Sequence, residues 1–453
     1  MIQRVLIANR SEIAVRIIRA CKEMGIETVA VYSQADKEAL HVQMADQAVC
    51  IGASLASESY LNMNNLIQAA CLTGCDAIHP GFGFLSENSR FARLVQECGL
   101  TWIGPRPEVI EQLGNKTEAR KMMAAKGVPI IPGMSKALSS EQEGLSVADE
   151  IGYPIILKAS NGGGGKGMRV VRSETEFQDA YYQTKSEAKQ FFGDEDVYIE
   201  KFIENPKHIE VQLAGDRYGN CVHFYERDCS FQIDNQKMME EAPCSCLSEA
   251  QRAALVESAC KACKAAKYDS VGTVEFLFDG NQHYFMEMNT RIQVEHPITE
   301  MITGIDLIAL QIRLAQGDHL PFTQAQIHKN GVAIECRINA EDVHHDFHGC
   351  AGKIRFYHCP GGNGIRVDSG IYSGYEVPPF YDSMLCKIIA YAPNRKACIQ
   401  KMKGALEEII VDGIETNEEF LYLALFQEDF LKGSYDTSMA AKFYQQCKKE
   451  ELL

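Results

Sequence analysis

The chain has 453 residues, of which 46% are hydrophobic and 23% are charged. This length predicts two to four domains with enough apolar residues for their cores. The net charge of -16 argues against a nonspecific nucleic-acid-binding protein and suits a soluble one, although a nucleotide needs only a local cluster of Lys and Arg.

The 17 cysteines show no spacing typical of a disulfide framework, which indicates reduced thiols and a cytoplasmic location. Cys260-x-x-Cys263 lacks a second pair and lies among residues at helical spacing, so we interpret it as two helix cysteines and not as a zinc site. No apolar run reaches membrane-spanning length and the N-terminus does not resemble a signal peptide, so we expect no membrane association.

The N-terminal residues predict a β-α-β unit. Residues 4–8 are typical of a strand, apolar residues from Ile13 recur at helical spacing until Gly25, and 28–32 predict a second strand. Such a start predicts an open parallel sheet, with ligands at the carboxyl ends of its strands. A further unit is predicted from the strand 77–78, the helix 88–98 and the strand 101–103.

The segment from His79 to Asn88 joins a predicted strand to a helix. Gly81-x-Gly83 is a weak signal for nucleotide binding. The presence of Ser86 could be explained by a structural role alone, as the helix cap. Both interpretations, a ligand loop and a plain connection, stay open. A new unit begins near Gly114 with a helix over 117–126, and the polar residues 135–150 predict a surface connection.

Two apolar strands, 153–158 and 168–171, bracket a run of glycines. Without Cβ atoms, the amides of such a loop can approach and cradle phosphates, and two flanking lysines add positive charge. A flexible linker is the alternative, but linkers are not bracketed by buried strands. We therefore predict a phosphate-covering lid, whose glycines are Gly162, Gly163, Gly164, Gly165 and Gly167.

Three segments follow the lid. The predicted strand 197–203 could offer backbone groups and an apolar seat to a purine through its residues 200–203. In 207–213 polar and apolar residues alternate, which places His208 on the face opposite the apolar side chains, where a lone histidine is more often structural than functional. Residues 227–241 are polar and unpatterned, which predicts a loop lining a cleft.

Polar residues recur at every second position after residue 286, and side chains at this spacing share one face of an extended segment. These residues are Glu287, Asn289, Arg291, Gln293 and Glu295. A strand with one face in water is the plain alternative. A buried strand that emerges with these side chains needs a partner for their charges.

A second carboxylate lies beside this segment. Residues 273–278 and 283–287 flank the turn signal at 279–281, so they predict a hairpin. Glu275 and Glu287 then fall on the same face, where two unpaired carboxylates would repel each other. A hard divalent cation such as Mg²⁺ removes that repulsion, so we favour a metal site over a surface hairpin.

The last third begins near Gly331. Residues 333–339 predict a strand, residues 349–391 predict short strands with Gly and Pro turns, and two helices are predicted over 394–409 and 416–431.

Several long motifs occur in an order that resembles the biotin carboxylase family, the ATP-grasp component of bacterial acetyl-CoA carboxylase, over about residues 2–445. The motifs are Ile7–Arg10, His79–Asn88, Lys158–Val171, Glu226–Ser230, Glu287–Pro297 and Glu335–Asp342. The resemblance implies an α/β (α+β) ATP-grasp fold with an N-terminal open parallel-sheet (Rossmann-like) domain and a C-terminal β-rich domain. The implied boundaries are 1–113, 114–330 with a lid at about 131–203, and 331–445.

The resemblance also implies a set of site residues. ATP would be held by the lid glycines and by Lys116, Lys158, Glu200, Lys201, Ile203, His208, Gln232, Asn235 and Leu277. Two Mg²⁺ or Mn²⁺ ions would bind Glu275, Glu287 and Asn289. Bicarbonate would lie among Lys237, Arg291, Gln293 and Val294, and biotin would face Arg337 and the segment Phe82, Gly83, Phe84.

The implied chemistry is the phosphorylation of bicarbonate by ATP to carboxyphosphate, followed by carboxylation of biotin. Glu295 would act as the general base on bicarbonate, Arg291 would hold the anions, and Arg337 would stabilise the enolate-like oxygen of biotin. We find no biotin-accepting Ala/Val-Met-Lys-Met hairpin in the sequence, and we interpret Lys401-Met-Lys403 as a coincidence because it lies in a predicted helix. The implied partners are therefore a separate biotin carboxyl carrier protein, carboxyltransferase subunits and a second copy in a homodimer.

Several positions depart from the family pattern: Ser11, Phe82, Ile233-Asp234, Asn235, Val343, Gly349 and Cys386. None of these positions is assigned as a metal ligand, as the general base or as a group that stabilises the oxyanion, so we expect the chain to have the activity of the family. The alternatives are another ATP-grasp ligase, which carboxylates a purine precursor or makes carbamoyl phosphate, and a non-catalytic nucleotide-binding homologue.

Overall fold

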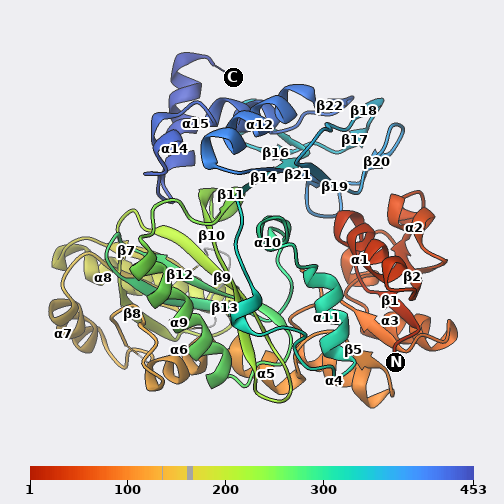
Figure 1. The fold of residues 1–453 in the computed structure, drawn as a ribbon. Coiled ribbons are helices and arrows are strands. Elements are labelled where there is room, and N and C mark those ends of the chain that lie inside the picture. The colour runs from red at the N-terminus through yellow and green to blue at the C-terminus, as the bar shows by residue number, and fades with distance from the viewer. Residues whose placement is uncertain (135, 161–166, 453) are drawn as a thin grey trace.

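A computed structural model describes residues 1–134, 136–160 and 167–452. The N-terminal part is a parallel sheet in the order β3-β2-β1-β4-β5 (Figure 1). Its strands are β1 (Arg4–Ile7), β2 (Glu27–Ser33), β3 (Gln47–Gly52), β4 (Ala77–His79) and β5 (Thr101–Trp102). Its helices are α1 (Ser11–Glu23), α2 (Leu40–Met44), α3 (Met63–Leu72), α4 (Ser89–Glu97) and α5 (Pro107–Gly114). The predicted β-α-β start and parallel sheet are confirmed.

The centre of the molecule is an antiparallel sheet of eight strands, in the order β13-β12-β9-β10-β11-β14-β21-β19. Their bounds are β9 (Lys207–Gly215), β10 (Cys221–Ile233), β11 (Gln236–Ala242), β12 (Val271–Phe278), β13 (His283–Asn289), β14 (Val332–Asn339), β19 (Ile365–Ser369) and β21 (Met384–Ala392). Strands from the last third of the chain thus continue the sheet that holds the Glu275 hairpin, and this continuity brings the two regions to one site.

Helices cover this sheet. α9 packs on β9 and β10, and α12 packs on β14 and β21. Their bounds and those of the other helices are α6 (Lys116–Ala125), α9 (Glu249–Ala265), α10 (His296–Thr303), α11 (Leu307–Ala315), α12 (Arg395–Glu408), α13 (Glu418–Ala424), α14 (Glu428–Lys432) and α15 (Met439–Glu450). Short antiparallel pairs complete this region: β15 (Glu341–Asp342) with β16 (His348–Gly349), β17 (Gly352–Lys353) with β20 (Glu376–Val377), and β18 (Phe356–His358) with β22 (Ile410–Asp412).

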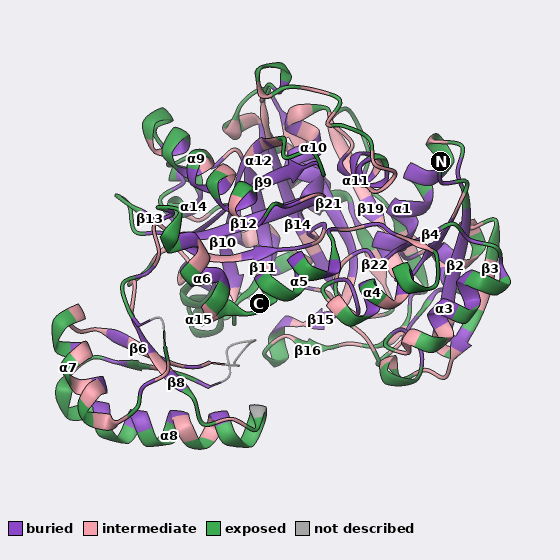
Figure 2. Ribbon diagram, turned by 90° about the horizontal axis from the view of Figure 1, so that it is seen from below, coloured by how far each residue is buried: buried purple, intermediate pink, exposed green. Residues whose placement is uncertain are grey.

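The lid is a separate unit with its own small core. It is a three-stranded sheet in the order β7-β6-β8 with two helices, and it projects from the rest of the molecule in Figure 2. Its elements are α7 (Glu141–Ile151), β6 (Ile155–Ala159), β7 (Met168–Val171), α8 (Glu174–Phe192) and β8 (Val197–Lys201). The predicted glycine hairpin is confirmed, because β6 and β7 pair antiparallel, from Ile155 with Val171 to Lys158 with Met168.

Four sequence predictions are corrected here. Most of the predicted connection 135–150 is helix α7, whose Gly144 and Ala148 are buried in the core of the lid. The predicted loop 227–241 is the hairpin β10–β11 in the middle of the sheet. Residues 416–431 hold two short helices, α13 and α14. The cap of α4 is Asn88, whose side chain accepts from Phe91 N, and not Ser86.

The predicted alternation at residues 287–295 is only partly a strand. β13 ends at Asn289, and the following residues turn into α10, for which Glu295 is the N-cap. Cys260 and Cys263 lie in α9, as predicted. In the described part of the chain, no helix combines the length and the apolar character that a membrane span requires.

Candidate active site

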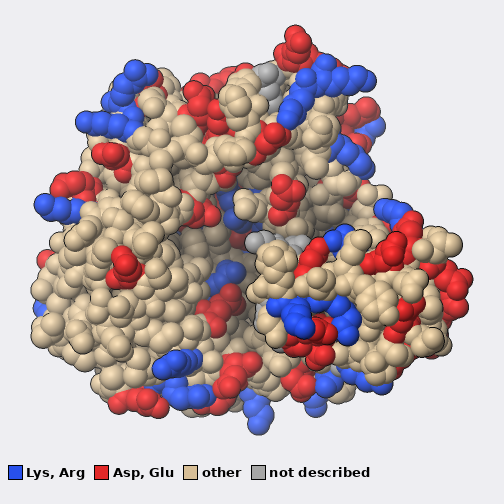
Figure 3. Space-filling model, turned by 180° about the vertical axis from the view of Figure 1, so that it is seen from behind, with Lys and Arg blue, Asp and Glu red and all other residues tan. Residues whose placement is uncertain are grey.

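A cavity of about 1180 Å³ lies between the lid, the large sheet and the N-terminal part. The molecule is hollowed near its middle when seen from behind, and basic and acidic side chains lie together in that hollow (Figure 3). Every described residue that the sequence assigned to the site lines the cavity except Gly167. Gly162 to Gly165 fall outside the described residues.

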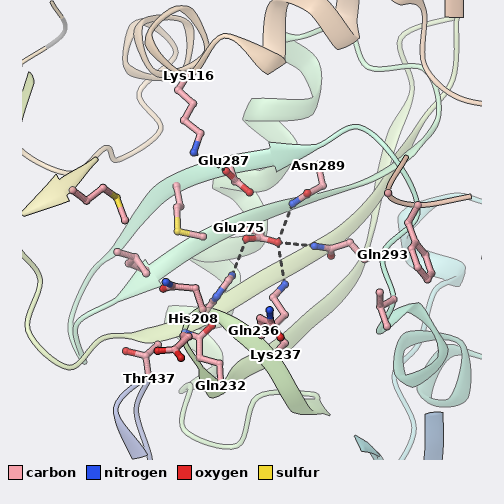
Figure 4. Close-up of a pocket in the computed structure, with 18 of the residues that line it drawn as sticks. Lys116, His208, Gln232, Gln236, Lys237, Glu275, Glu287, Asn289, Gln293 and Thr437 are labelled. Carbon is pink, nitrogen blue, oxygen red and sulfur yellow. Dashed lines mark hydrogen bonds and ion pairs between the residues drawn. The ribbon is translucent and has the colours of Figure 1, made fainter. Parts of the chain in front are cut away.

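Glu275 accepts hydrogen bonds from four side chains at the floor of the cavity (Figure 4). Its Oε1 accepts from Lys237 Nζ at 3.0 Å, from Asn289 Nδ2 at 2.9 Å and from Gln293 Nε2 at 2.6 Å. Its Oε2 lies 2.9 Å from His208 Nε2. Burial alone would raise the pKa of Glu275, but Lys237 and His208 hold that pKa well below its usual range. Glu275 is therefore a carboxylate.

Glu287 lies directly opposite Glu275 in the pairing of β12 with β13, which confirms the prediction that the two side chains share one face of a hairpin. Its carboxylate is partly exposed to the cavity, and within the described residues its one ion pair is with Lys116 Nζ at 3.5 Å. Two carboxylates and the amide oxygen of Asn289 form the set of hard oxygen ligands that Mg²⁺ and Mn²⁺ bind. The residues fit a divalent cation, because two such carboxylates on neighbouring strands need positive charge between them.

Glu295 sits between two cations. Its Oε1 lies 2.7 Å from Lys237 Nζ, and its Oε2 lies 2.9 Å from Arg337 Nη2. Its side chain is 2% exposed. Burial alone would raise the pKa of Glu295, but Lys237 and Arg337 outweigh it and hold that pKa well below its usual range. Glu295 is ionised at neutral pH, as a general base must be.

Lys237 holds three carboxylates together. Its Nζ lies 2.7 Å from Glu210, in addition to its contacts with Glu275 and Glu295. Burial opposes the charge, but the three carboxylates raise the pKa of Lys237 well above its usual value. One ammonium thus links the candidate metal ligand to the candidate base.

Arg337 is anchored by a residue that the sequence did not single out. Its guanidinium contacts Glu240, whose side chain is fully buried, at 2.6 Å from Nε. Burial raises the pKa of Glu240 to about 7, although Arg337 lowers it. Glu240 pairs in register with Glu335, which is also buried. Arg337 therefore lies between two carboxylates, Glu240 and Glu295.

Arg291 connects the N-terminal part to the site. Its Nε lies 3.0 Å from Glu87 Oε2, and its Nη2 donates to Asn289 Oδ1 at 2.8 Å. Glu87 belongs to the segment 79–88, whose Phe82, Gly83 and Phe84 line the same cavity. The geometry therefore favours a role of this segment at the site over its interpretation as a plain connection.

Asn9 fixes the course of that segment. Its Nδ2 donates to the carbonyls of Pro80 and Phe82 at 2.7 Å each. Ser11, where the family pattern has glycine, has a φ of 57°, in the left-handed region that favours glycine. The structure thus shows why a glycine suits that position.

The nucleotide side of the cavity is lined by the lid. Lys158 Nζ lies 2.6 Å from Glu200, which also binds Arg120. Lys201 Nζ instead donates to the carbonyls of Gly152 and Tyr153 at 2.9 and 3.1 Å, so its ammonium serves the lid and not the cavity. Residues 200–203 all line the cavity.

The remaining predicted ligands fall on two sides of the cavity. His208, Gln232 and Asn235 come from β9 and the β10–β11 hairpin, and Ile203 and Leu277 supply apolar surface. Gly167 is buried and does not line the cavity, and its carbonyl accepts from Ala159 N at 2.8 Å within the lid hairpin.

Sequence reasoning missed several polar residues that organise the site. They are Arg120, Glu210, Gln212, Arg227 and Glu240, all of them buried. Arg227 alone contacts Glu210, Gln212, Thr273, Gln293 and Thr299. Glu210 and Gln212 share the face of His208 in the alternating strand, so that alternation carried the signal. Arg227 and Glu240 lie in the segment that was interpreted as a loop.

The floor of carboxylates and cations beneath a glycine-containing lid is the arrangement of an ATP-grasp enzyme. Three family models match the chain: biotin carboxylase, N-terminal domain, over 1–110; carbamoyl-phosphate synthase L chain, ATP binding domain, over 115–323; and biotin carboxylase C-terminal domain, over 335–442.

Named relatives match almost the whole chain. Biotin carboxylase 1 of Bacillus subtilis (strain 168) is 52% identical over 439 residues, covering 96% of this chain and 98% of the relative. Biotin carboxylase of Haemophilus influenzae is 50% identical over 434 residues, covering 96% and 97%. The chain belongs to the biotin carboxylase family, a family of ATP-dependent ligases.

Solved structures agree with this assignment. A biotin carboxylase–β,γ-ATP complex from Campylobacter jejuni superposes with a TM-score of 0.94 at 46% identity, covering 98% of this chain and 99% of that one. The biotin carboxylase domain dimer of Hydrogenobacter thermophilus 2-oxoglutarate carboxylase, with MgADP, ADP and bicarbonate, gives 0.92 at 46% identity, covering 99% and 98%. Another ATP-grasp ligase and a non-catalytic homologue are not favoured.

Proposed function

We propose that this chain carboxylates biotin on a separate biotin carboxyl carrier protein, using ATP and bicarbonate by way of carboxyphosphate. This would be the first half-reaction of acetyl-CoA carboxylase, which leads to malonyl-CoA and fatty acid synthesis. Support comes from the family, from the ATP analogue in the Campylobacter jejuni complex, and from the MgADP and bicarbonate in the Hydrogenobacter thermophilus domain.

The observation that carries the proposal is the contact of Glu295 with both Lys237 and Arg337. A carboxylate held between two cations suits a site for small anions, because bicarbonate and phosphate can take the places of the carboxylate on those cations. Once a cation turns to the anion, Glu295 loses part of the charge that lowers its pKa and becomes a stronger base.

We assign the roles in the first step as follows. Bicarbonate binds to Lys237, Arg291, Gln293 and the backbone at Val294. Glu295 takes the proton of bicarbonate as a bicarbonate oxygen attacks the γ-phosphorus of ATP. The product is carboxyphosphate, and ADP leaves. Arg291 can hold the anion because its guanidinium is already oriented by Glu87 and Asn289.

In the second step, carboxyphosphate yields carbon dioxide and phosphate, and the phosphate removes the ureido proton of biotin. Negative charge then develops on the ureido oxygen, where Arg337 stabilises it, and the ureido nitrogen attacks carbon dioxide to form the C–N bond of carboxybiotin. Glu240 keeps the guanidinium in place through its contact at 2.6 Å. The segment Phe82, Gly83 and Phe84 supplies the wall against which biotin would lie.

ATP would bind between the lid and the sheet. Lys116, Lys158, His208 and Gln232 would bind its phosphates and polar groups, and Ile203 and Leu277 would contact the base; in support, all six residues line the cavity. Mg²⁺ or Mn²⁺, in two sites, would be held by Glu275, Glu287 and Asn289, and would offset the negative charge of the transferred phosphoryl group.

The proposal includes partners and organisation. The biotin carrier and carboxyltransferase subunits are separate chains, and the active species is a homodimer, as the Hydrogenobacter thermophilus domain is described. We retain the domain division 1–113, 114–330 and 331–445, and a cytoplasmic location.

The test is phosphate release from ATP and Mg²⁺ with bicarbonate, measured with and without free biotin. Stimulation of bicarbonate-dependent release by biotin supports the proposal. Another ATP-grasp ligase would show no response to biotin, and a non-catalytic homologue would show no bicarbonate-dependent release at all.

A further inference from the structure

Two cysteines lie side by side in the turn that follows β11. Cys244 is buried and Cys246 is exposed, and their Sγ atoms are 3.3 Å apart. Only one residue separates them in the chain, so their proximity is a local property of the turn. Neither residue belongs to the cavity described above.

The backbone of this turn is anchored on both sides. Arg252 Nη2 donates to the carbonyl of Cys244 at 3.0 Å, and Arg252 is itself bound to Glu226. Ser245 Oγ donates to Glu241 Oε1 at 3.0 Å. These contacts hold the turn in the conformation that places both thiols on the same side.

The two thiols differ in their surroundings. Cys244 donates its thiol hydrogen to Asp228 Oδ2 at 3.4 Å. Burial raises the pKa of Cys244 well above its usual value. The Cys244 sulfur, 3.3 Å away, lowers the pKa of Cys246, and Lys207 also lowers it, although burial opposes them. The exposed sulfur is thus the more nucleophilic and the buried one is protonated.

A metal site is an alternative interpretation of this cluster, because the ligand atoms of Asp228, Cys244 and Cys246 lie within 4.8 Å of one another. Lys207 argues against it. Its Nζ lies 2.7 Å from Asp228 Oδ2, the same oxygen that faces Cys244. A cation already occupies that oxygen, which leaves two sulfur ligands where a structural zinc site takes four ligands.

We propose that Cys244 and Cys246 are a modification site, at which a hydroperoxide oxidises the two thiols to an intramolecular disulfide. The Cys246 thiolate attacks the terminal peroxide oxygen, so that an S–O bond forms, the O–O bond breaks, and the leaving oxygen departs as water or an alcohol after it takes up a proton. Cys246 is then a sulfenic acid. The Cys244 sulfur attacks the Cys246 sulfur, which forms the S–S bond, and hydroxide leaves as water with the Cys244 proton.

The geometry favours the second step. The two sulfurs must approach from 3.3 Å to about 2.05 Å, a movement that rotation of the exposed Cys246 side chain can supply. The product no longer has the thiol hydrogen that Cys244 donates to Asp228. The reduced and oxidised forms therefore present different hydrogen bonding to that buried carboxylate.

Asp228 is connected to the candidate active site. Its Oδ1 accepts from Ser230 Oγ at 2.5 Å, and Ser230 Oγ accepts from the backbone N of His208 at 3.0 Å. His208 in turn contacts Glu275 at 2.9 Å. The modification site thus lies at the end of a hydrogen-bonded series that reaches a candidate metal ligand.

The test is peptide mapping of the full-length reduced protein after one equivalent of hydrogen peroxide, followed by alkylation of the remaining thiols. We expect the peptide with Cys244 and Cys246 to lose two hydrogens and to become resistant to alkylation. The rate of this oxidation should be about ten times the rate at which the exposed Cys98 is oxidised. Equal rates at Cys98 and at the pair would overturn the proposal.

Two variants separate the roles of the thiols. In Cys244→Ser the oxidised Cys246 has no second thiol, so we expect a sulfenic acid that a 1,3-dione captures. In Cys246→Ser the buried Cys244 should stay reduced. Oxidation of Cys244 in that variant at the wild-type rate would contradict the proposal. So would one equivalent of tightly bound zinc in the reduced protein that is lost in Cys246→Ser, since it would show a metal site.

Discussion

Arg337 Nη2 lies 2.9 Å from Glu295 Oε2, although Arg337 belongs to β14 and Glu295 to the turn before α10. The contact exists because β14 continues the sheet that holds the Glu275–Glu287 hairpin. It places the group assigned to biotin beside the group assigned to bicarbonate. The two proposed steps can thus share one cavity, with Glu295 and Arg337 as its centre.

Replacement of Glu295 tests the assignment of the base. Glu295→Gln keeps the size of the side chain and removes its basicity, so we expect bicarbonate-dependent phosphate release to fall by about 10²- to 10⁴-fold. Nucleotide affinity should be retained, which binding of a fluorescent ATP analogue can measure. Glu249→Gln, on the exposed surface of α9, is the control and should behave as wild type. Unchanged turnover in Glu295→Gln would remove the proposed role.

Lys237→Gln tests the electrostatic control of that base. Lys237 is the first of three cations, with Arg337 and Arg227, that hold the pKa of Glu295 low, so its removal raises that pKa. We expect the acid limb of kcat/KM against pH to move upward by about one pH unit, with a lower plateau. Lys261→Gln on α9 is the matched control. An acid limb that stays in place would show that Lys237 does not set the pKa of the base.

Glu287→Gln tests the proposed metal site. Loss of one of two carboxylate ligands should raise the Mg²⁺ concentration for half-maximal activity by about tenfold or more, while saturating Mg²⁺ partly restores turnover. Activity measured over a Mg²⁺ titration gives this value. Glu257→Gln, exposed on α9, should leave it unchanged. An unaltered Mg²⁺ requirement in Glu287→Gln would place the ion elsewhere.

Glu12 provides a prediction about stability and pH. Burial raises the pKa of Glu12 to about 6, although Lys387 Nζ lies 3.3 Å away and lowers it, with Asp368 and Arg366 also nearby. The folded state holds the proton more tightly than the unfolded one. The stabilisation is therefore full below about pH 4.5 and is lost as pH rises through about 6.

Glu12→Gln removes this titration. The free energy of unfolding of the wild type should fall relative to the variant by about 2 kcal/mol between pH 4.5 and 7. Thermal or denaturant unfolding of both proteins at these two pH values measures the difference. A difference between the proteins that does not change with pH would contradict the raised pKa.

Much of the site could be predicted because it lies in local patterns. The β12–β13 hairpin has a turn signal and alternating residues, so the shared face of Glu275 and Glu287 follows from the sequence, and the structure adds their direct pairing. A separate alternation, at 207–213, placed His208 on a polar face. The lid strands were predictable because they are apolar on both sides of the glycines.

The β10–β11 hairpin was not predicted, because its polar residues are buried and satisfied by partners far along the chain. Arg227 binds Glu210, and Glu240 binds Arg337 97 residues away. These contacts replace the hydrophobic alternation that marks a strand, and only the assembled sheet reveals them. Helix α7 was missed because its polar residues face solvent and few of its side chains are buried.

The most direct test of the central claim follows the carbon of bicarbonate. The protein is incubated with ATP, Mg²⁺, isotopically labelled bicarbonate and free biotin or a biotinylated carrier domain, and both acid-labile label on biotin and ADP are measured. With the carrier as acceptor, we predict one labelled carbon fixed for each ADP formed, and a rate of fixation that is about 10²- to 10⁴-fold lower in Glu295→Gln. ADP formation without any label on biotin would contradict the account.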